Sequence, residues 1–414
     1  MTSRADFHCR GCGASDVGVF VDLGTSPPAN SFLDDASLDR PEAVWPLRAV
    51  VCRSCHLVQL DEVVDPRAIF SDYAYFSSFS ADWLRHAEAF AEGAVPRFGL
   101  EAGGLVLEIA SNDGYLLQHF RARGVRVLGI EPAANVAAAA TEQGIPTRVE
   151  FFDRRLAASL VAEGVRPRLV VANNVLAHVP EVNDFVAGLA LLLSDDGALS
   201  IEVPHLLRLI EGVEFDTIYH EHYYYYSLLA LEVLFGRHGL AIVDVEQLAT
   251  HGGSLRVTAR HEGAGGPRSP AVDAVLRTER AAGLHAAAGY EGFDARVESV
   301  KEGLLGFLAD ATRNGKRVAG YGAPAKGNTL LNFCGIGTDL IPFTVDRNPG
   351  KQGRFLPGSR IPISAPERIE HERPDFVLIL PWNLRDEITR QLAGIAAWGG
   401  RFVVPLPELA VIIP

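Results

Sequence analysis

Short apolar runs alternate with helix-like stretches over most of the chain, and this alternation limits the fold more than any other feature. Between about residues 85 and 260 the runs are LVLEIA, RVLGIEP, RVEFF, RLVVANNV and ALSIEVP. Apolar strands separated by helices are typical of a parallel α/β sheet. The next two runs, AIVDVEQL and SLRVTAR, are separated by THGG with no helical stretch, so we expect an antiparallel hairpin at one edge of this sheet.

A second α/β unit follows the linker GAGGPRSP and two helix-like stretches that run to about residue 315. Its apolar runs are RVAGYGAP, FTVDRN, DFVLILPW and RFVVPLP. A chain of 414 residues exceeds the usual size of one hydrophobic core. We therefore predict an α/β protein of three parts, namely an N-terminal module at 1–70, a first Rossmann-like domain at 71–265 and a second Rossmann-like domain at 266–414.

Four cysteines near the N-terminus form two CxxC pairs, whereas the fifth, Cys334, lies far along the chain. Two CxxC pairs can bring four thiolates together, which suits tetrahedral Zn²⁺ with no open position for water. Four unrelated reduced cysteines are the weaker alternative, because both pairs fall within the first sixty residues. We predict a structural zinc site and assign it no catalytic role. Its ligands are Cys9, Cys12, Cys52 and Cys55.

The charge balance disfavours a nucleic-acid partner. The formal net charge is −13, with 38 lysines and arginines against 51 aspartates and glutamates, whereas phosphate binding needs a positive field. The N-terminus lacks the apolar run of a signal peptide, and no stretch holds the roughly 18 uninterrupted apolar residues of a bilayer span. We expect a cytoplasmic protein, with a monomer as the working expectation, that binds neither nucleic acid nor membrane.

The first strand of the central unit ends in LEIASNDGYLL, at the place where a nucleotide-binding fold turns from strand to helix. This loop departs from GxGxxG, whose glycines let backbone amides approach a pyrophosphate. Only Gly114 is present, and Glu108, Asn112 and Asp113 crowd the loop. Acidic residues repel a pyrophosphate but suit S-adenosylmethionine (SAM), whose amine and sulfonium are both positive. The loop therefore predicts a SAM site.

Further polar and aromatic residues follow the next strands of this sheet. Glu131 ends the second strand, where a carboxylate can accept hydrogen bonds from both ribose hydroxyls. A lone glutamate after a strand is more often a solvated strand end, but the ordered series LEIASNDG, GIEP, VEFF and VVANNVLAHV favours a class I methyltransferase. The other expected cofactor contacts are Phe151 or Phe152 beside the adenine, and Asn173 and Asn174 in the same crevice.

The CxxC pairs, LEIASNDGYLL, HEHYYYYS, THGGSLRV and GYGAPAKGN occur in this order in a known family, which the chain closely resembles over nearly its whole length. These are the SAM-dependent C-methyltransferases that add branch methyl groups to TDP-linked deoxysugars in antibiotic biosynthesis. The resemblance implies methylation at C-3′ of a TDP-4-keto-deoxysugar, with a 3-amino-2,3,6-trideoxyhexose as the expected substrate. Methylation at C-5′ is the alternative within the family.

The stretch YHEHYYYYS, residues 219–227, brings proton-transfer groups next to four tyrosines. Carbon methylation beside a ketone needs a base that forms an enolate and a donor for the enolate oxygen. Neutral histidine, with an ordinary pKa of about 6.5, can take the proton. The resemblance implicates His222 as the base, and Tyr219 is a candidate donor. Glu221 either binds a sugar amine or hydroxyl or orients an imidazole, and His178 is the competing base.

Other interpretations of these stretches stay open. A metal held by HEH lacks a third ligand nearby, and the four tyrosines are each more typical of packing than of substrate contact. The segment SDYAYFSSFS, residues 71–80, resembles an active-site lid in which Tyr73 reaches the sugar and Ser80 the cofactor. The alternative for this segment is the start of a linker helix.

The second α/β unit is expected to bind the nucleotide diphosphate. Its turn GYGAPAKGN permits close backbone approach and precedes a helix, Lys326 adds charge, and Arg347 sits at the next strand end. An NAD-dependent nucleotide-sugar oxidoreductase is one alternative, although the spacing is not GxGxxG. A noncatalytic zinc-ribbon protein that binds SAM and a partner is the other.

Overall fold

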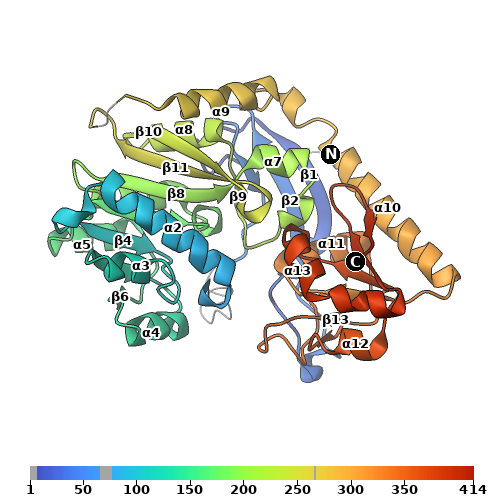
Figure 1. The fold of residues 1–414 in the computed structure, drawn as a ribbon. Helices are drawn as coiled ribbons and strands as arrows, with labels where there is room; N and C mark the ends of the chain where they lie inside the picture. The colour runs from blue at the N-terminus through green and yellow to red at the C-terminus, as the bar shows by residue number, and fades with distance from the viewer. Residues whose placement is uncertain (1–6, 66–76, 265–266) are drawn as a thin grey trace.

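The computed structural model describes residues 7–65, 77–264 and 267–414. Within these residues the chain forms three β-sheets, and Figure 1 shows the large central sheet beside the smaller C-terminal one. The predicted α/β fold class is therefore confirmed, whereas the exact division of the chain at residues 70 and 265 stays a prediction. None of the described helices is long and apolar enough to cross a membrane.

The N-terminal module is a four-stranded antiparallel sheet in the order β1–β2–β3–β9. A hairpin of β1 (Val17–Ser26) and β2 (Trp45–Cys52) connects the two CxxC pairs, and β3 (Val58–Leu60) follows the second pair. The fourth strand, β9 (Tyr224–Tyr225), comes from the YHEHYYYYS stretch and pairs antiparallel with β3. A segment from far along the chain thus completes this small sheet.

The central sheet has seven strands in the order β10–β11–β8–β7–β4–β5–β6. The strands β8, β7, β4, β5 and β6 run parallel, so their carboxyl ends meet at one edge. The pair β10 and β11 forms the expected antiparallel hairpin at the edge beside β8. The strands are β4 (Leu105–Ile109), β5 (Arg126–Ile130), β6 (Thr147–Arg148), β7 (Leu169–Asn173), β8 (Ala198–Pro204), β10 (Leu240–Leu248) and β11 (Ser254–His261).

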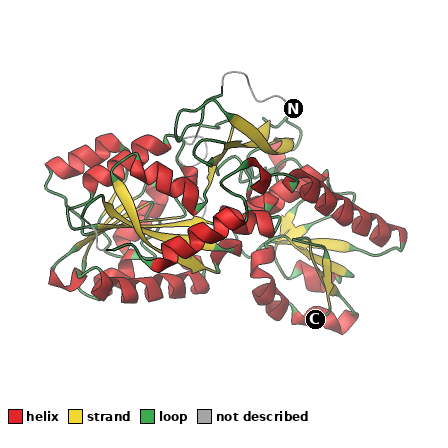
Figure 2. Cartoon of the chain, turned by 90° about the horizontal axis from the view of Figure 1, so that it is seen from above, coloured by secondary structure: helices red, strands yellow, loops and turns green. Residues whose placement is uncertain are grey.

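Helices cover both faces of the central sheet, as Figure 2 shows. Several begin at side-chain caps: Ser80 accepts from the amide of Trp83, and Asp153 accepts from that of Leu156. These helices are α2 (Ala81–Arg97), α3 (Leu117–Ala122), α4 (Ala134–Glu142), α5 (Arg154–Ala162), α6 (Val182–Leu192), α7 (Leu206–Glu211) and α8 (Leu228–Gly236).

The C-terminal part is a six-stranded sheet in the order β14–β13–β12–β15–β16–β17, parallel except for β17. Two long helices lead into it, α9 (Pro270–Ala281) and α10 (Phe293–Arg313). The strands are β12 (Val318–Tyr321), β13 (Thr344–Val345), β14 (Ile363–Ser364), β15 (Phe376–Ile379), β16 (Arg401–Val404) and β17 (Ala410–Ile412), and the helices are α11 (Ala325–Cys334), α12 (Arg368–Glu372) and α13 (Arg385–Gln391).

Helix α11 joins the C-terminal part to the other two. The Thr329 hydroxyl donates to the carbonyl of Ile218 at 3.1 Å, and the Asn328 amide donates to the carbonyl of Ala29 at 2.5 Å. Both polar side chains are buried. Because a buried polar group without a partner is costly, these two hydrogen bonds hold the helix in its position. The three parts therefore meet around residues that flank the YHEHYYYYS stretch.

Candidate active site

The loop after β4 lies at the carboxyl edge of the central sheet. Its backbone is sharply bent, with positive φ at Asn112 (+50°) and Gly114 (+82°). A Cβ on Gly114 would lie 2.9 Å from Cγ1 of Ile145, so glycine is required there. Backbone amides of residues 77 and 78 donate to the side chains of Asn112 (2.9 Å) and Asp113 (3.1 Å). The segment before α2 is thereby anchored to this loop.

Glu131 at the end of β5 braces the same loop. Its Oε2 accepts from the amide of Asn112 at 3.0 Å, and its Oε1 accepts from the amide of Ala133 at 2.9 Å. Burial raises the pKa of Glu131, although these two amides oppose that shift. Burial also raises the pKa of Glu108 well above its ordinary value, with further contributions from Glu131 and Asp113. The carboxyl groups around the loop are thus crowded and short of positive partners.

Unsatisfied acceptors at this edge fit a ligand rich in positive charge. Among the described residues, Oδ1 of Asp113, of Asn173 and of Asn174 is buried and makes no hydrogen bond. Buried acceptors without a donor are costly, so a donor-bearing ligand stabilises them. The SAM amine and sulfonium supply positive charge of this kind, and the residues present fit the cofactor.

Two of the expected cofactor contacts have other partners. The Phe152 ring is 8% exposed and packs edge-to-face on Phe185 at 5.3 Å, while Phe151 is 44% exposed. Ser80 caps α2 with its hydroxyl, which matches the helix-start interpretation of that segment. Tyr73 lies outside the described residues. The roles of these residues toward SAM and sugar stay predictions.

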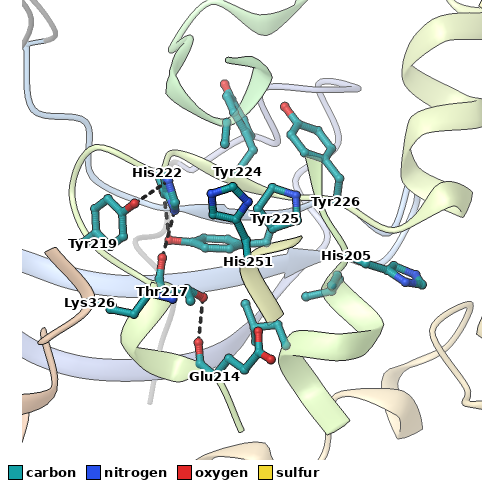
Figure 3. Close-up of a pocket in the computed structure, with 14 residues that line it drawn as sticks. His205, Glu214, Thr217, Tyr219, His222, Tyr224, Tyr225, Tyr226, His251 and Lys326 are labelled. Atoms are coloured by element: carbon teal, nitrogen blue, oxygen red, sulfur yellow. Dashed lines mark hydrogen bonds between the residues drawn. The ribbon is translucent and has the colours of Figure 1, made fainter. Parts of the chain in front are cut away.

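Tyr219 and His222 form a hydrogen-bonded pair beside the carboxyl edge (Figure 3). The Tyr219 hydroxyl is 2.6 Å from Nε2 of His222, and Nδ1 of His222 is 3.0 Å from the carbonyl of Thr217. A carbonyl only accepts, so Nδ1 carries the proton and Nε2 accepts from tyrosine. Burial lowers the pKa of His222 well below its ordinary value, and neighbouring His178 adds to this shift. The imidazole is therefore neutral with its basic nitrogen in the pocket.

His178 packs beside His222, with 4.7 Å between ring centroids. Its Nδ1 donates to the carbonyl of Glu221 at 2.7 Å, and burial lowers its pKa to about 4. The Glu221 carboxylate instead accepts from the backbone amide and side chain of Asn30, at 3.3 and 3.2 Å. The structure thus brings Tyr219, His222 and His178 together, whereas the carboxylate of Glu221 bonds to the N-terminal module.

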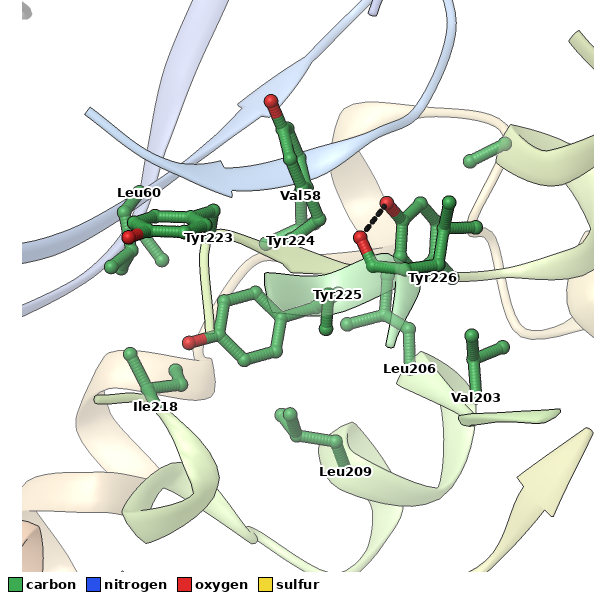
Figure 4. Packing of buried hydrophobic residues seen from close by; sticks show 14 of the residues in the cluster. Val58, Leu60, Val203, Leu206, Leu209, Ile218, Tyr223, Tyr224, Tyr225 and Tyr226 are labelled. Atoms are coloured by element: carbon green, nitrogen blue, oxygen red, sulfur yellow. Dashed lines mark hydrogen bonds between the residues drawn. The ribbon is translucent and has the colours of Figure 1, made fainter. Parts of the chain in front are cut away.

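The four tyrosines of YHEHYYYYS are all buried, and Figure 4 shows them packed among aliphatic side chains. Each hydroxyl donates to a backbone carbonyl, from Tyr223 to Val64, Tyr224 to Pro180, Tyr225 to His222 and Tyr226 to Leu176. Their rings exclude water from the floor of the pocket while their hydroxyls are satisfied internally. Packing is therefore the role that the geometry gives them.

The opposite wall of the pocket carries residues that the sequence patterns did not single out. Glu214 is 8% exposed and lines the pocket with His251 of the THGG turn. The turn needs glycine at position 252, where φ is +94° and a Cβ would collide with the Glu214 carboxylate. Burial raises the pKa of Glu214 to about 8 and that of neighbouring Asp216 to about 7.

Lys326, on the first turn of α11, completes this wall from the C-terminal part. Its Nζ donates to Oδ1 of Asn383 at 2.9 Å and lies 4.3 Å from the centroid of the Trp382 ring. Trp382 in turn donates to Asp216 at 2.8 Å. Arg347 lies apart from this cluster, exposed and 3.4 Å from Glu387. Lys326 and Arg347, both expected at the diphosphate, therefore occupy different surroundings.

The four predicted zinc ligands converge in the N-terminal module. The Sγ atoms of Cys9, Cys12, Cys52 and Cys55 all lie within 4.8 Å of one another. The Sγ distances are 3.6 Å from Cys9 to Cys55 and 3.5 Å from Cys12 to Cys52, close to the separation of about 3.8 Å expected around tetrahedral zinc. A cluster of four cysteine sulfurs fits a closed structural site.

Comparison with known proteins decides the family. The chain is 39% identical over 405 residues to C-methyltransferase NovU of Streptomyces niveus, a match covering 98% of this chain and 96% of the relative. The chain belongs to the C-methyltransferase family. Family models match in chain order a zinc binding domain (9–70), a methyltransferase domain (83–245) and a C-methyltransferase C-terminal domain (249–407).

Solved structures are more distant from this C-methyltransferase. Magnesium protoporphyrin IX methyltransferase of Synechocystis is 15% identical with a TM-score of 0.36, covering 48% of this chain and 99% of that one. A methyltransferase of Clostridium acetobutylicum is 11% identical with a TM-score of 0.36, covering 44% and 92%. The family assignment, with the four clustered cysteines, confirms the predicted SAM-dependent C-methyltransferase with a zinc-binding module.

Proposed function

We propose that this C-methyltransferase adds a methyl group to C-3′ of a TDP-linked 4-keto-deoxysugar, with a 3-amino-2,3,6-trideoxyhexose as the sugar. The observation that carries the proposal is the Tyr219–His222 pair, with a 2.6 Å contact and a neutral imidazole in a water-poor pocket. A proton next to a ketone is acidic enough for such a base once the developing enolate is stabilised.

The reaction needs one proton transfer and one carbon–carbon bond. The C-3′ proton passes to the Tyr219–His222 pair, and the C–H electrons form the enolate with charge on the C-4′ oxygen. Bound SAM would supply the methyl group as a sulfonium electrophile: its methyl–sulfur bond would break as the carbon–carbon bond forms, and S-adenosylhomocysteine would leave as the neutral thioether. The packed tyrosine rings exclude water, which would otherwise return a proton to the carbon.

His178 is the competing base in this scheme. Its ring adjoins His222, but its Nδ1 donates to a backbone carbonyl and burial lowers its pKa to about 4. The Tyr219–His222 pair carries a second proton-transfer group in contact with the imidazole, and this favours it for the transfer.

The C-terminal part is proposed to bind the thymidine diphosphate. The amino end of α11 lies within GYGAPAKGN, and before it φ of Gly322 is +89° and a Cβ there would lie 2.6 Å from Pro381. Free amides at a helix start attract phosphate, and Arg347 lies at the end of the neighbouring strand β13.

Proton exchange in deuterated water tests the proposal directly. TDP-4-keto-deoxysugars with a 3-amino or a 3-hydroxy group are incubated with the enzyme, with and without SAM, and the C-3′ and C-5′ signals are followed by NMR. Selective loss at C-3′ and a mass gain of one methyl group with SAM are expected. Selective loss at C-5′ would overturn the assignment of the carbon, and no reaction with any of these sugars would overturn the substrate class.

A further inference from the structure

Enolate formation places a negative charge on one oxygen, and most donors around the pocket already have acceptors. The Tyr219 hydroxyl donates to His222, and that of Thr217 donates to the carbonyl of Glu214 at 2.7 Å. Nε2 of His205 is 2.8 Å from Oε1 of Glu279. His251, whose pKa burial lowers to about 4, is neutral. Tyr219, Thr217 and His205 thus already have partners, and His251 carries no charge.

Lys326 is the cation that lines this pocket in the described part of the chain. Its ammonium has three N–H bonds, and Asn383 accepts one of them. Burial lowers the pKa of Lys326, but Asp216 and Glu214 oppose that shift. The Trp382 ring, 4.3 Å from Nζ, also favours the charged form. The Lys326 side chain thus has hydrogen-bonding capacity to spare beside a ring that favours its charged form.

Lys326 is also close to the proton-transfer pair. His222, His251 and Lys326 line the same pocket. Figure 3 shows Lys326 on the same side of the pocket as Thr217 and Tyr219. Arg347, by contrast, is 65% exposed and paired with Glu387. The two basic residues thus suit different parts of one substrate.

We propose that Lys326 stabilises the enolate by donating a hydrogen bond to the C-4′ oxygen, and does not bind the diphosphate. This inference rests on the proposed function. As the C-3′ proton moves to His222, the C–H pair becomes the C-3′–C-4′ double bond and the carbonyl pair moves onto oxygen. The ammonium keeps its proton and faces the new charge. His222, near the central sheet, then supplies the base, and Lys326 of the C-terminal part supplies the partner of the oxyanion.

The test separates enolate stabilisation from phosphate binding. Lys326→Met and Lys326→Arg are compared with the wild type for TDP affinity by calorimetry, for C-3′ exchange at saturating substrate, and for kcat. Lys316→Met is the matched control, because Lys316 is in the same part of the chain and pairs with Asp375 at 2.8 Å. Circular dichroism and Tm establish that each variant folds, and the arginine variant retains the charge if the methionine variant does not fold.

For Lys326→Met we expect exchange and kcat to fall by roughly 100- to 1000-fold, with TDP affinity within about twofold of wild type because the diphosphate contacts remain. Lys326→Arg is expected to keep part of the rate, because it keeps the charge in a different geometry. Normal exchange in Lys326→Met, or a tenfold loss of TDP affinity with an unchanged rate at saturation, would overturn the inference. Failure of the wild type on every TDP-4-ketosugar would instead overturn the proposed function.

Discussion

The Tyr219 hydroxyl and Nε2 of His222 are 2.6 Å apart, and Nδ1 of His222 is fixed by a backbone carbonyl. This arrangement selects the tautomer in which the basic nitrogen faces the tyrosine. Burial lowers the pKa of His222, so the imidazole does not have to carry charge before substrate binds. The pair can therefore accept a proton without first giving up a stabilising ion pair.

Replacing His222 by Asn is expected to abolish C-3′ exchange, with a loss of at least about 100-fold, because the amide cannot accept the proton. SAM affinity is expected to stay within about twofold, since the residues expected to hold SAM are unchanged. Calorimetry and NMR exchange measure the two effects. His238→Asn is the control, because His238 pairs with Asn183 at 2.9 Å and does not line the pocket. Near-normal exchange in His222→Asn, and its loss in His178→Asn, would transfer the role of base to His178.

Glu214 gives a pH dependence of stability with a definite sign. Its pKa is about 8 in the folded chain against an ordinary 4.5, so the native state holds a proton that the unfolded chain releases above about pH 4.5. Stability is expected to fall as pH rises from about 5 to about 8. Glu214→Gln keeps a neutral side chain and should be more stable than wild type at pH 8, by roughly 1 to 4 kcal/mol. Denaturant midpoints across this range measure the difference.

Glu211→Gln is the control for this experiment, because Glu211 lies at the surface and pairs with Arg208. Its profile should follow that of the wild type. Parallel profiles for the wild type and Glu214→Gln would show that Glu214 is ionised in the folded protein at neutral pH.

Zinc removal is expected to destabilise the whole enzyme. Purified protein should contain one zinc per chain by elemental analysis, and Cys12→Ser should lose the metal together with about 3 kcal/mol or more of stability. Cys334→Ser is the control, because Cys334 lies in α11 outside the cysteine cluster. A fully folded, metal-free preparation of wild type would contradict the zinc prediction.

Glu131 is expected to contribute to SAM affinity through the ribose hydroxyls. Glu131→Ala removes the acceptor and also the brace to Asn112, so SAM affinity should fall by roughly tenfold or more. Glu142→Ala at the end of α4 is the control, because Glu142 is exposed and far along that helix. Calorimetric titration with SAM in both variants measures the effect. Equal affinities would remove Glu131 from the cofactor site.

The sequence predicts the α/β layers and the zinc ligands well, because each has a local signature. Strand periodicity locates β4, β5, β7 and β8, whereas the run RVEFF overlaps β6 at Arg148 alone. CxxC spacing identifies Cys9 with its three partners without knowledge of tertiary contacts. The contact between Tyr219 and His222 is equally local, because both residues belong to one motif. Such features depend on residues close together in the sequence, so they can be recognised before the fold is known.

The buried carboxyl groups of Glu214 and Asp216 beside the pocket could not be predicted in the same way. Glu214 and Asp216 stand in GVEFDTIY, where nothing distinguishes them from surface carboxylates until α11 and Trp382 cover them. Glu221 shows the converse, because its neighbours suggest the pocket while its carboxylate bonds to Asn30. A side chain's direction in an irregular segment depends on packing from distant parts of the chain. The sequence signal that could have pointed to Glu214 and Asp216 is their position two residues apart, shortly before YHEH.

Strand β9 makes the zinc-binding module and the candidate active site inseparable for protein engineering. Its two tyrosines complete the sheet that carries the cysteines, and His222 lies only two residues before it. A chimera that exchanges residues 7–65 between relatives would break the interface between β3 and β9 unless residues 219–227 travelled with them. The useful crossover units in this family are therefore discontinuous, and recombination at the apparent domain borders is expected to give poorly folded hybrids.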